Sequence, residues 1–226
     1  MPLREVRHDQ PDDCLHCETI AVRGRLHQWD IPAHRHEGLH QFQLLERGGA
    51  SATLDGLQLR LRAPVALMLA PGTVHAFRYD PDSAGHQLTV PSVLLRQALA
   101  GTPVLLPRLD ASFVLDRDSL GADASEAVDQ FLLITREFEG ARPGRIEALK
   151  AQALLLALWF LRRGGDGLHD EQRSALRDTL VQRFRALLEL HLRRHPPVSF
   201  YAAQLQVSAD HLSRACRTVT GLAALD

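Results

Sequence analysis

The stretch VSFYAAQLQVSADHLSRACRTVTG, residues 198–221, predicts two short helices joined by a tight turn. Ser199 and Ser208 stand where the two helices would begin, and a serine side chain there can accept a hydrogen bond from an unpaired backbone N–H. Gly221 follows the second helix, where a left-handed residue is common. Two helices joined in this way are typical of a helix-turn-helix, whose second helix can enter the major groove of DNA. An ordinary helical hairpin would show the same pattern.

Arginine is concentrated near the C-terminal end of the chain. Residues 172–221 contain eight arginines and three acidic residues, although the chain of 226 residues has a formal charge of −1. A basic segment on an otherwise acidic body is the charge distribution expected of a DNA-binding end. All basic residues except Lys150 are arginines, and a guanidinium group suits contacts with phosphate and guanine.

The composition argues against membrane and secreted classes of protein. The start of the chain is charged and lacks the apolar core of a signal peptide. The longest apolar run, residues 151–161, is shorter than the roughly 20 residues that span a bilayer. Three cysteines are an odd number and argue against a disulfide framework, so we expect a cytoplasmic protein without membrane association. Cys14 and Cys17 form a C-x-x-C pair, but no second pair supports a zinc or redox site.

Residues 19–91 contain short β-type runs separated by turn residues. The first run is TIAVRGRLHQW, residues 19–29, and five more follow without an intervening helix. In residues 57–62 leucine alternates with polar residues as in a half-buried strand, and pairs such as Asp55-Gly56 mark the turns. Six short strands with this punctuation predict an antiparallel β-barrel or jelly roll of the cupin kind.

The chain becomes helical after residue 91. Two longer helices are predicted at residues 123–139 and 145–163, and the second is apolar on almost every face from residue 154 to 161. A helix of this kind is buried on more than one side. We interpret it as a dimerisation element whose second partner is another copy of the chain. Burial between the barrel and the preceding helix would explain the same pattern.

We therefore expect an α+β protein in three parts. Residues 1–122 would form the antiparallel barrel with a polar N-terminal arm, and residues 123–167 a helical linker and dimerisation region. Residues 168–226 would form an all-α segment, in which a long helix from about residue 171 precedes the helix-turn-helix. The sequence GGDG, residues 164–167, predicts a joint before this last part.

Four of the twelve histidines have an informative spacing. His34 and His36 would project from the same face of a strand, His40 follows, and His75 comes after a Pro-Gly turn. This spacing resembles the cupin pattern, HxHxxx(E) followed by PG-x-x-H, with His40 where metal-binding cupins carry glutamate. Four imidazoles could hold zinc, iron, nickel or copper. Because the resemblance also covers cupins that have lost the metal, we expect a small organic ligand and no resident cofactor.

Alternation along the strands adds side chains to this group. If His75 faces the interior, Phe77 and Tyr79 do so as well, and His40 would bring Phe42 with it. Flat apolar walls with imidazole and guanidinium groups suit a small aromatic acid or a sugar. The candidate ligand-binding residues are His34, His36, His40, Phe42, His75, Phe77 and Tyr79, together with Arg25 and Trp29 on one face of the first strand.

A histidine-bearing barrel followed by helices and the motif of residues 201–221 resembles the AraC family of bacterial transcription regulators. The motif residues that carry the resemblance are Ala202 or Ala203, Leu205, Val207, Ser208, Leu212, Arg214, Cys216, Arg217, Thr220 and Gly221. The resemblance implies a homodimeric, non-enzymatic regulator in which a ligand in the barrel changes how two subunits meet promoter DNA or RNA polymerase. The segment HRHEGLHQFQLLERG, residues 34–48, is most similar to the PobR-like branch, which responds to 4-hydroxybenzoate.

The resemblance also implies roles on the second helix of the motif. Asp210, Ser213 and Arg214 would lie toward base edges, and Arg217 nearer the phosphates. An arginine in the major groove can bind guanine in a bidentate way and contribute roughly 1–3 kcal/mol of discrimination. The family carries two helix-turn-helix units, and this sequence ends just after the first. We therefore expect a C-terminally truncated form that binds ligand and dimerises but binds DNA poorly.

Two alternatives stay open. A metal-dependent cupin enzyme, such as a dioxygenase or isomerase, would use His34, His36, His40 and His75. The basic C-terminal segment and its turn motif favour the regulator, because an enzyme does not need them. A sensory domain that only dimerises, and competes with a full-length regulator, is the other alternative.

Overall fold

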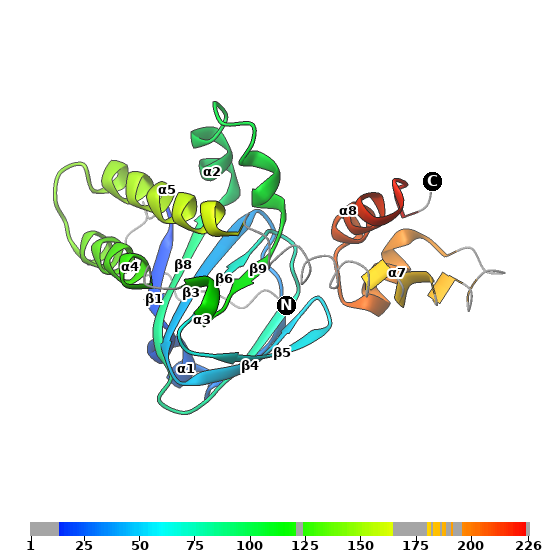
Figure 1. Ribbon diagram of the computed structural model, residues 1–226, viewed down its shortest axis with the longest axis horizontal. Coiled ribbons are helices and arrows are strands. Elements are labelled where there is room, and N and C mark those ends of the chain that lie inside the picture. Colours follow the sequence, from blue (N-terminus) through cyan, green and yellow to red (C-terminus); the bar gives the residue numbers. More distant parts are fainter. Residues whose placement is uncertain are drawn as a thin grey trace.

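The computed structural model of the chain describes residues 14–120, 124–164 and 196–224, together with residues 180, 181, 183–185, 187, 188 and 191. The predicted N-terminal arm and most of the long helix predicted from residue 171 lie outside these residues. The described part is a mixed α+β structure, with the strands in its N-terminal half and helices alone in its C-terminal part (Figure 1). None of the described helices is both long and apolar enough to span a bilayer.

Two antiparallel sheets pack face to face in residues 14–120. The first sheet has the order β1 (His16–Thr19), β8 (Ala84–Pro91), β3 (Leu39–Arg47), β6 (Val65–Leu69), β9 (Phe113–Leu115). The second has the order β2 (Asp30–His34), β7 (His75–Tyr79), β4 (Gly49–Leu54), β5 (Leu57–Arg62). No ladder of hydrogen bonds joins the two sheets among these strands, so the antiparallel strands are confirmed but they do not close into the predicted barrel. The domain is a cupin-like sandwich, open between its sheets.

The first predicted strand is mostly a helix. β1 ends at Thr19, and α1 (Ile20–Leu26) follows it directly. The Thr19 side chain accepts a hydrogen bond from the backbone N–H of Val22 at 3.2 Å, which caps the helix. In α1, Arg23 is buried, with 6% of its surface exposed, and Arg25 faces solvent. Arg25 therefore shares no strand face with Trp29, contrary to the prediction.

The first sheet separates two hydrophobic cores because its residues alternate between its faces. Leu45 of β3 packs between the two sheets, with Leu67 of β6. Phe42 and Leu44 point the other way, toward a helical layer, where the rings of Phe42 and Phe160 are 5.1 Å apart. Figure 1 shows this layer on the side of the first sheet that faces away from β4 and β5. It consists of α2 (Ser92–Ala98), α4 (Ala124–Glu139) and α5 (Arg145–Arg163).

α5 is buried by contacts with other elements of the same chain. α5 packs against α4 and α2, and its residues Leu156 and Phe160 are fully buried in the same core as the first sheet. Leu155 remains 58% exposed. Most of the apolar surface of α5 is therefore buried between the first sheet and the preceding helix, which was the alternative to dimerisation. The short elements η1 (Leu106–Asp110) and α3 (Arg117–Leu120) connect the sandwich to this layer.

The predicted pair of short helices is confirmed as α7 (Val198–Leu205) and α8 (Ala209–Thr220). Ser208 caps α8, since its side chain accepts a hydrogen bond from the backbone N–H of His211 at 3.0 Å. Gly221 has the predicted left-handed conformation, with φ of +79°. The prediction that Ser199 caps the first helix is wrong, because α7 begins one residue earlier and has no side-chain cap. The two helices share a hydrophobic core of their own.

Candidate functional site

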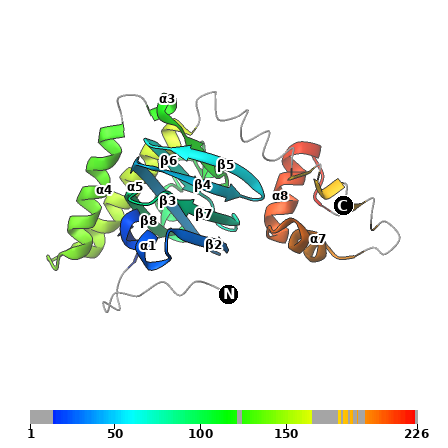
Figure 2. The ribbon, with the colours of Figure 1, turned by 90° about the horizontal axis from the view of Figure 1, so that it is seen from below.

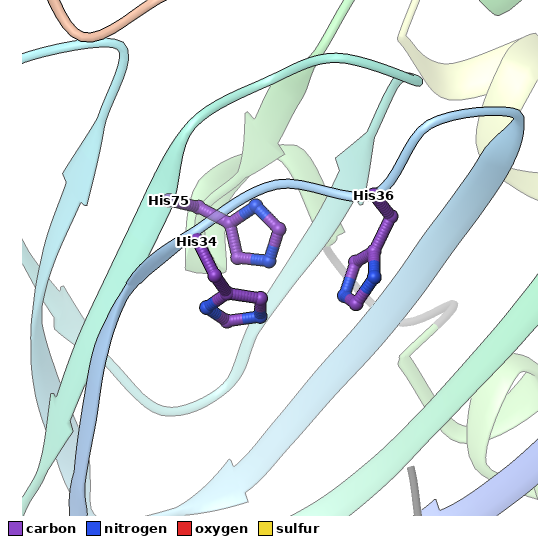
Figure 3. Close-up of side chains that lie close together, drawn as sticks. All are labelled: His34, His36 and His75. Atoms are coloured by element: carbon purple, nitrogen blue, oxygen red, sulfur yellow. The ribbon is translucent and has the colours of Figure 1, made fainter. Parts of the chain in front are cut away.

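Three of the four patterned histidines meet at one end of the sandwich (Figure 3). His34 ends β2 and His75 begins β7, and the two residues are paired in register between these strands. His36 lies two residues beyond β2. The ring centroids are 4.3 Å apart for His34 and His75, 5.0 Å for His34 and His36, and 5.4 Å for His36 and His75. The predicted grouping of these three imidazoles is confirmed, and we call it the histidine cluster.

Two backbone carbonyls fix the tautomers of His34 and His75. Nδ1 of His34 lies 2.8 Å from the carbonyl oxygen of Pro32, and Nδ1 of His75 lies 2.9 Å from that of Thr73. A carbonyl oxygen can only accept, so each Nδ1 carries the proton and donates it. The lone pair of each ring is then on Nε2. The Nε2 atoms of His34, His36 and His75 are all buried and have no hydrogen-bond partner.

Burial keeps the cluster uncharged at neutral pH. Burial, with a smaller contribution from the neighbouring His34, lowers the pKa of His75 to about 3. Burial is also the largest cause that lowers the pKa values of His34 and His36. Three neutral imidazoles with free lone pairs can accept hydrogen bonds or coordinate a metal ion.

His40 and Phe42 lie on the opposite face of the first sheet from the cluster. Nε2 of His40 is 2.8 Å from the carbonyl oxygen of Leu109 in η1, and the His40 side chain is completely buried. Phe42 packs on Phe160 of α5. The prediction that these two residues face the interior with His75 is wrong. The chain turns between β2 and β3 at Gly38, which has φ of +75°, so the two-residue alternation is not continuous from His36 to His40.

Phe77 and Tyr79 face the space between the sheets, as predicted from their alternation with His75. Their rings are stacked at 5.5 Å, and the ring of Phe77 is 5.8 Å from that of His75. The Tyr79 hydroxyl donates a hydrogen bond to Oε1 of Gln43 at 3.0 Å. Burial raises the pKa of Tyr79, so the phenol keeps its proton. Trp29 packs partly against this core, next to Gly24 of α1.

A row of buried polar side chains between the sheets was missed by the sequence interpretation. Nε2 of Gln43 donates to Oε1 of Gln87 at 3.1 Å, and Nε2 of Gln87 donates to Oε1 of Glu18 at 3.3 Å. The guanidinium of Arg23 forms an ion pair with the same carboxylate. Burial raises the pKa of Glu18, but hydrogen bonds and the charges of His16 and Arg23 outweigh it and lower the pKa overall.

The signal for this polar row was present in the sequence. Gln41 and Gln43 in β3, and Gln87 and Thr89 in β8, are polar residues spaced by two, with an apolar residue between the members of each pair. Oε1 of Gln41 and Oγ1 of Thr89 are buried and have no hydrogen-bond partner. A buried polar atom without a partner costs about 1–3 kcal/mol, so such atoms mark places where a ligand or water can bind.

A cleft of about 690 Å³ separates the histidine cluster from the helix pair. Its sandwich side includes Ala33, His34 and Val74, and its helical side includes Ala203, Gln206 and Val207. His34 is therefore reached from this cleft. Figure 2 shows α8 beside the end of the β4–β5 hairpin.

The predicted DNA-contacting residues lie on α8. Asp210, Arg214 and Arg217 are exposed and recur with the spacing of one helix face, and Ser213 is half-buried. Leu212 is completely buried in the core of the helix pair, as predicted.

Residues 16–159 match the family model of the AraC-like ligand binding domain. The chain belongs to this family. The match includes both sheets, α4 and most of α5. No curated protein matched the sequence.

Several solved structures are similar to this chain. KdgF from Halomonas sp. is 27% identical, with 27% of this chain and 58% of KdgF covered and a TM-score of 0.26. The AraC-like transcriptional activator CuxR is 12% identical, with 82% of this chain and 63% of CuxR covered and a TM-score of 0.36. ToxT from Vibrio cholerae O395 is 8% identical, with 91% of this chain and 74% of ToxT covered and a TM-score of 0.41. The chain thus spans less than two thirds of KdgF and of CuxR.

Proposed function

We propose that the chain is a ligand-responsive transcription regulator whose AraC-like domain senses a small molecule between its two sheets. The observation that carries the proposal is the set of buried, unpartnered polar atoms in a domain of a ligand-binding family. Nε2 of His34, His36 and His75, Oε1 of Gln41 and Oγ1 of Thr89 belong to this set. A ligand that satisfied these atoms would recover the free energy that their burial costs.

An aromatic acid such as 4-hydroxybenzoate is the ligand class that we propose. The stacked rings of Phe77 and Tyr79 offer flat apolar walls, and Arg23 offers a guanidinium group for a carboxylate. Oε1 of Gln41, which is buried without a partner, can accept a hydrogen bond from a phenolic hydroxyl. Arg23 takes the place that the sequence interpretation gave to Arg25.

We propose promoter DNA as the macromolecular partner, read by α8 as the second helix of a helix-turn-helix. Its exposed stripe of Asp210, Arg214 and Arg217, backed by the buried Leu212, supports this role. We also propose that the chain acts in the cytoplasm and as a homodimer. Leu132 and Leu133 of α4 and Leu155 of α5 are exposed apolar residues that a second copy would cover. RNA polymerase is a further partner that the family suggests.

A thermal-shift assay with aromatic acids and sugars tests the sensor. Because a ligand binds the folded chain, a ligand at about 100 times its Kd should stabilise the chain by about 2.7 kcal/mol. This raises the Tm of a chain of this size by roughly 5–10 °C. An aromatic acid should produce this shift and a sugar should not. No shift with any compound would overturn the sensor assignment.

A metal-dependent enzyme is the second candidate, and the histidine cluster is the observation that favours it. Incubation of the zinc- or iron-loaded chain with the same aromatic acids, followed by chromatography, measures turnover. Recovery of each acid unchanged supports the assignment as a regulator. A new product would show that the chain is an enzyme.

A further inference from the structure

We infer that the histidine cluster binds hydroxyl groups of the effector, and that the effector is an aromatic acid with two adjacent hydroxyls on its ring. This inference rests on the proposed function, because it specifies the ligand of the same site. The Nε2 atoms of His34, His36 and His75 are buried and have no hydrogen-bond partner. One ligand nitrogen from each residue lies within 4.8 Å of the other two. Three ring nitrogens therefore lie within reach of one small polar group.

The tautomers of the cluster require hydrogen-bond donors from a ligand. Nδ1 of His34 and Nδ1 of His75 donate to backbone carbonyls, so Nε2 of each neutral ring can only accept. A single hydroxyl group has one proton and satisfies one of these two acceptors. Two adjacent hydroxyls satisfy both. Because a buried acceptor without a partner is costly, the second hydroxyl should strengthen binding.

The charges around the cluster disfavour ionic groups. An ionised carboxylate has no proton to donate, so it would place its own lone pairs against those of the histidines. A protonated amine has protons to donate, but a buried cation needs a compensating negative charge. After burial itself, the positive charge of Arg23 contributes to the lowered pKa values of all three histidines. The group that fits the cluster is therefore neutral and carries O–H donors.

An aromatic ring would place such hydroxyls beside the cluster. The ring of Phe77 faces the space between the sheets, and its centroid is 5.8 Å from that of His75 and 5.5 Å from that of Tyr79. The stacked rings form a flat apolar wall that continues from the cluster. A planar ligand on this wall would keep its apolar face against the rings and direct its hydroxyls toward the histidines.

A further unpartnered acceptor lies at the same end of the sandwich. Oε1 of Gln41 and Oγ1 of Thr89 are buried without a partner, and the two residues are opposite each other in the β3–β8 ladder. Gln41 is also opposite Leu69, the last residue of β6. Residues 70–74 lead directly from there to His75. Gln41 therefore extends the set of acceptors that the cluster begins, which favours a ligand with more than one donor.

The backbone fixes the cluster before a ligand binds. The pairing of β2 with β7 places His34 beside His75. The loop that carries His36 is attached to the turn before β7, because the backbone N–H of Gly72 donates to the carbonyl oxygen of His36 at 2.9 Å. Little freedom is then lost when a ligand binds, so hydrogen bonds to the cluster contribute more fully to affinity.

Isothermal titration of the full chain with a series of benzoic acids tests the inference. Benzoate has no hydroxyl, 4-hydroxybenzoate has one, and 3,4-dihydroxybenzoate has two adjacent ones. In 3,4-dimethoxybenzoate both oxygens remain but neither carries a proton. EDTA in the buffer prevents a metal ion from mediating binding of the adjacent hydroxyls. The Kd should fall about tenfold from 4-hydroxybenzoate to 3,4-dihydroxybenzoate, and 3,4-dimethoxybenzoate should bind no more tightly than benzoate.

Two variants of the cluster and one matched control locate the hydroxyl contacts. His34→Ala and His75→Ala each remove one acceptor, so each should reduce the preference for two hydroxyls over one to less than about threefold. His40→Gln removes an imidazole on the far face of the first sheet and keeps a donor for the carbonyl oxygen of Leu109. This control should keep the full preference. Far-UV circular dichroism shows which variants are folded.

The inference would be overturned if 3,4-dimethoxybenzoate bound as tightly as 3,4-dihydroxybenzoate, or if a folded His34→Ala or His75→Ala variant kept the full preference. Tighter binding of 4-(aminomethyl)benzoate than of 3,4-dihydroxybenzoate would also overturn it, because the cluster would then bind a cation. If the acids bind regardless of their hydroxyls, only this inference fails. If none of them binds the unmodified chain, the proposed aromatic-acid sensor fails together with it.

Discussion

The carboxylate of Asp55 joins the sandwich to the helix pair, because its Oδ2 lies 2.9 Å from Nε2 of His211 on α8. Its other oxygen, Oδ1, accepts a hydrogen bond from the backbone N–H of Val74 at 2.9 Å, just before β7 and the cluster residue His75. One side chain in the β4–β5 turn therefore contacts both the segment that leads to the histidine cluster and the helix proposed to read DNA.

Replacing His211 with Ala should loosen α8 from the sandwich without unfolding either part. The two side chains keep some contact with solvent, since 22% of His211 and 14% of Asp55 is exposed, and ion pairs that reach solvent contribute about 0–1 kcal/mol, so we expect little change in Tm. Hydrogen–deuterium exchange should become faster in α7 and α8 and stay unchanged in β3. Unchanged exchange in α7 and α8 would mean that the contact does not hold the helix pair in solution.

Arg23 and Arg25 form a matched pair of test positions on α1. Arg23→Gln removes one partner of a buried ion pair and leaves the Glu18 carboxylate less well compensated, so we expect a loss of about 3 kcal/mol in unfolding free energy. Arg25→Gln changes an exposed side chain and should stay within about 0.5 kcal/mol of the unmodified chain. Urea denaturation measures both. Equal losses of unfolding free energy in the two variants would show that the Arg23–Glu18 ion pair does not stabilise the folded chain.

Phe42→Ala should destabilise the chain by about 3–5 kcal/mol, because it opens a cavity beneath Phe160 in the layer between the first sheet and α5. Phe77→Ala should cost a similar amount, but it should also weaken aromatic-acid binding, since Phe77 faces the space between the sheets. Denaturation and ligand titration at a temperature where both variants are folded separate the two effects. A Phe42→Ala variant with impaired ligand binding would contradict the observed orientation of β3.

The thiol of Cys17 should make the chain less stable at high pH. Burial raises the pKa of Cys17 from 9.0 to about 11, so between these values the unfolded chain loses a proton that the folded chain keeps. Stability should therefore fall as the pH rises from about 9 to about 11, by at most about 1.4 kcal/mol per pH unit from this group. Denaturation at pH 8, 9 and 10 should show a smaller decline for Cys17→Ala. The same decline in both would assign it to other groups, such as Tyr79.

The helix pair could be predicted closely from the sequence because its signals are local. The cap at Ser208 and the left-handed Gly221 depend on a few neighbouring residues, and both are present in the structure. The convergence of His34, His36 and His75 could be predicted from spacing and turn position. These features need no knowledge of how distant segments pack.

The errors come from features that tertiary packing decides. Ile20 and Val22 resemble strand residues, but Thr19 caps a helix there and the buried Arg23 anchors it to Glu18. The direction of His40 depends on the turn at Gly38, which resets the alternation between β2 and β3. The split into two sheets depends on strand pairing, which residue patterns along one strand do not determine.

The open edges of the sandwich have a consequence for how its specificity could change. Since no hydrogen-bond ladder ties one sheet to the other among the described strands, the spacing between them is set by the side chains that fill the gap. Exchanging interior residues for larger or smaller ones would let the sheets separate or approach while each sheet kept its own register. The width of the space between the sheets is therefore a property of a few interior side chains, and it can change without a change in the pairing of any strand.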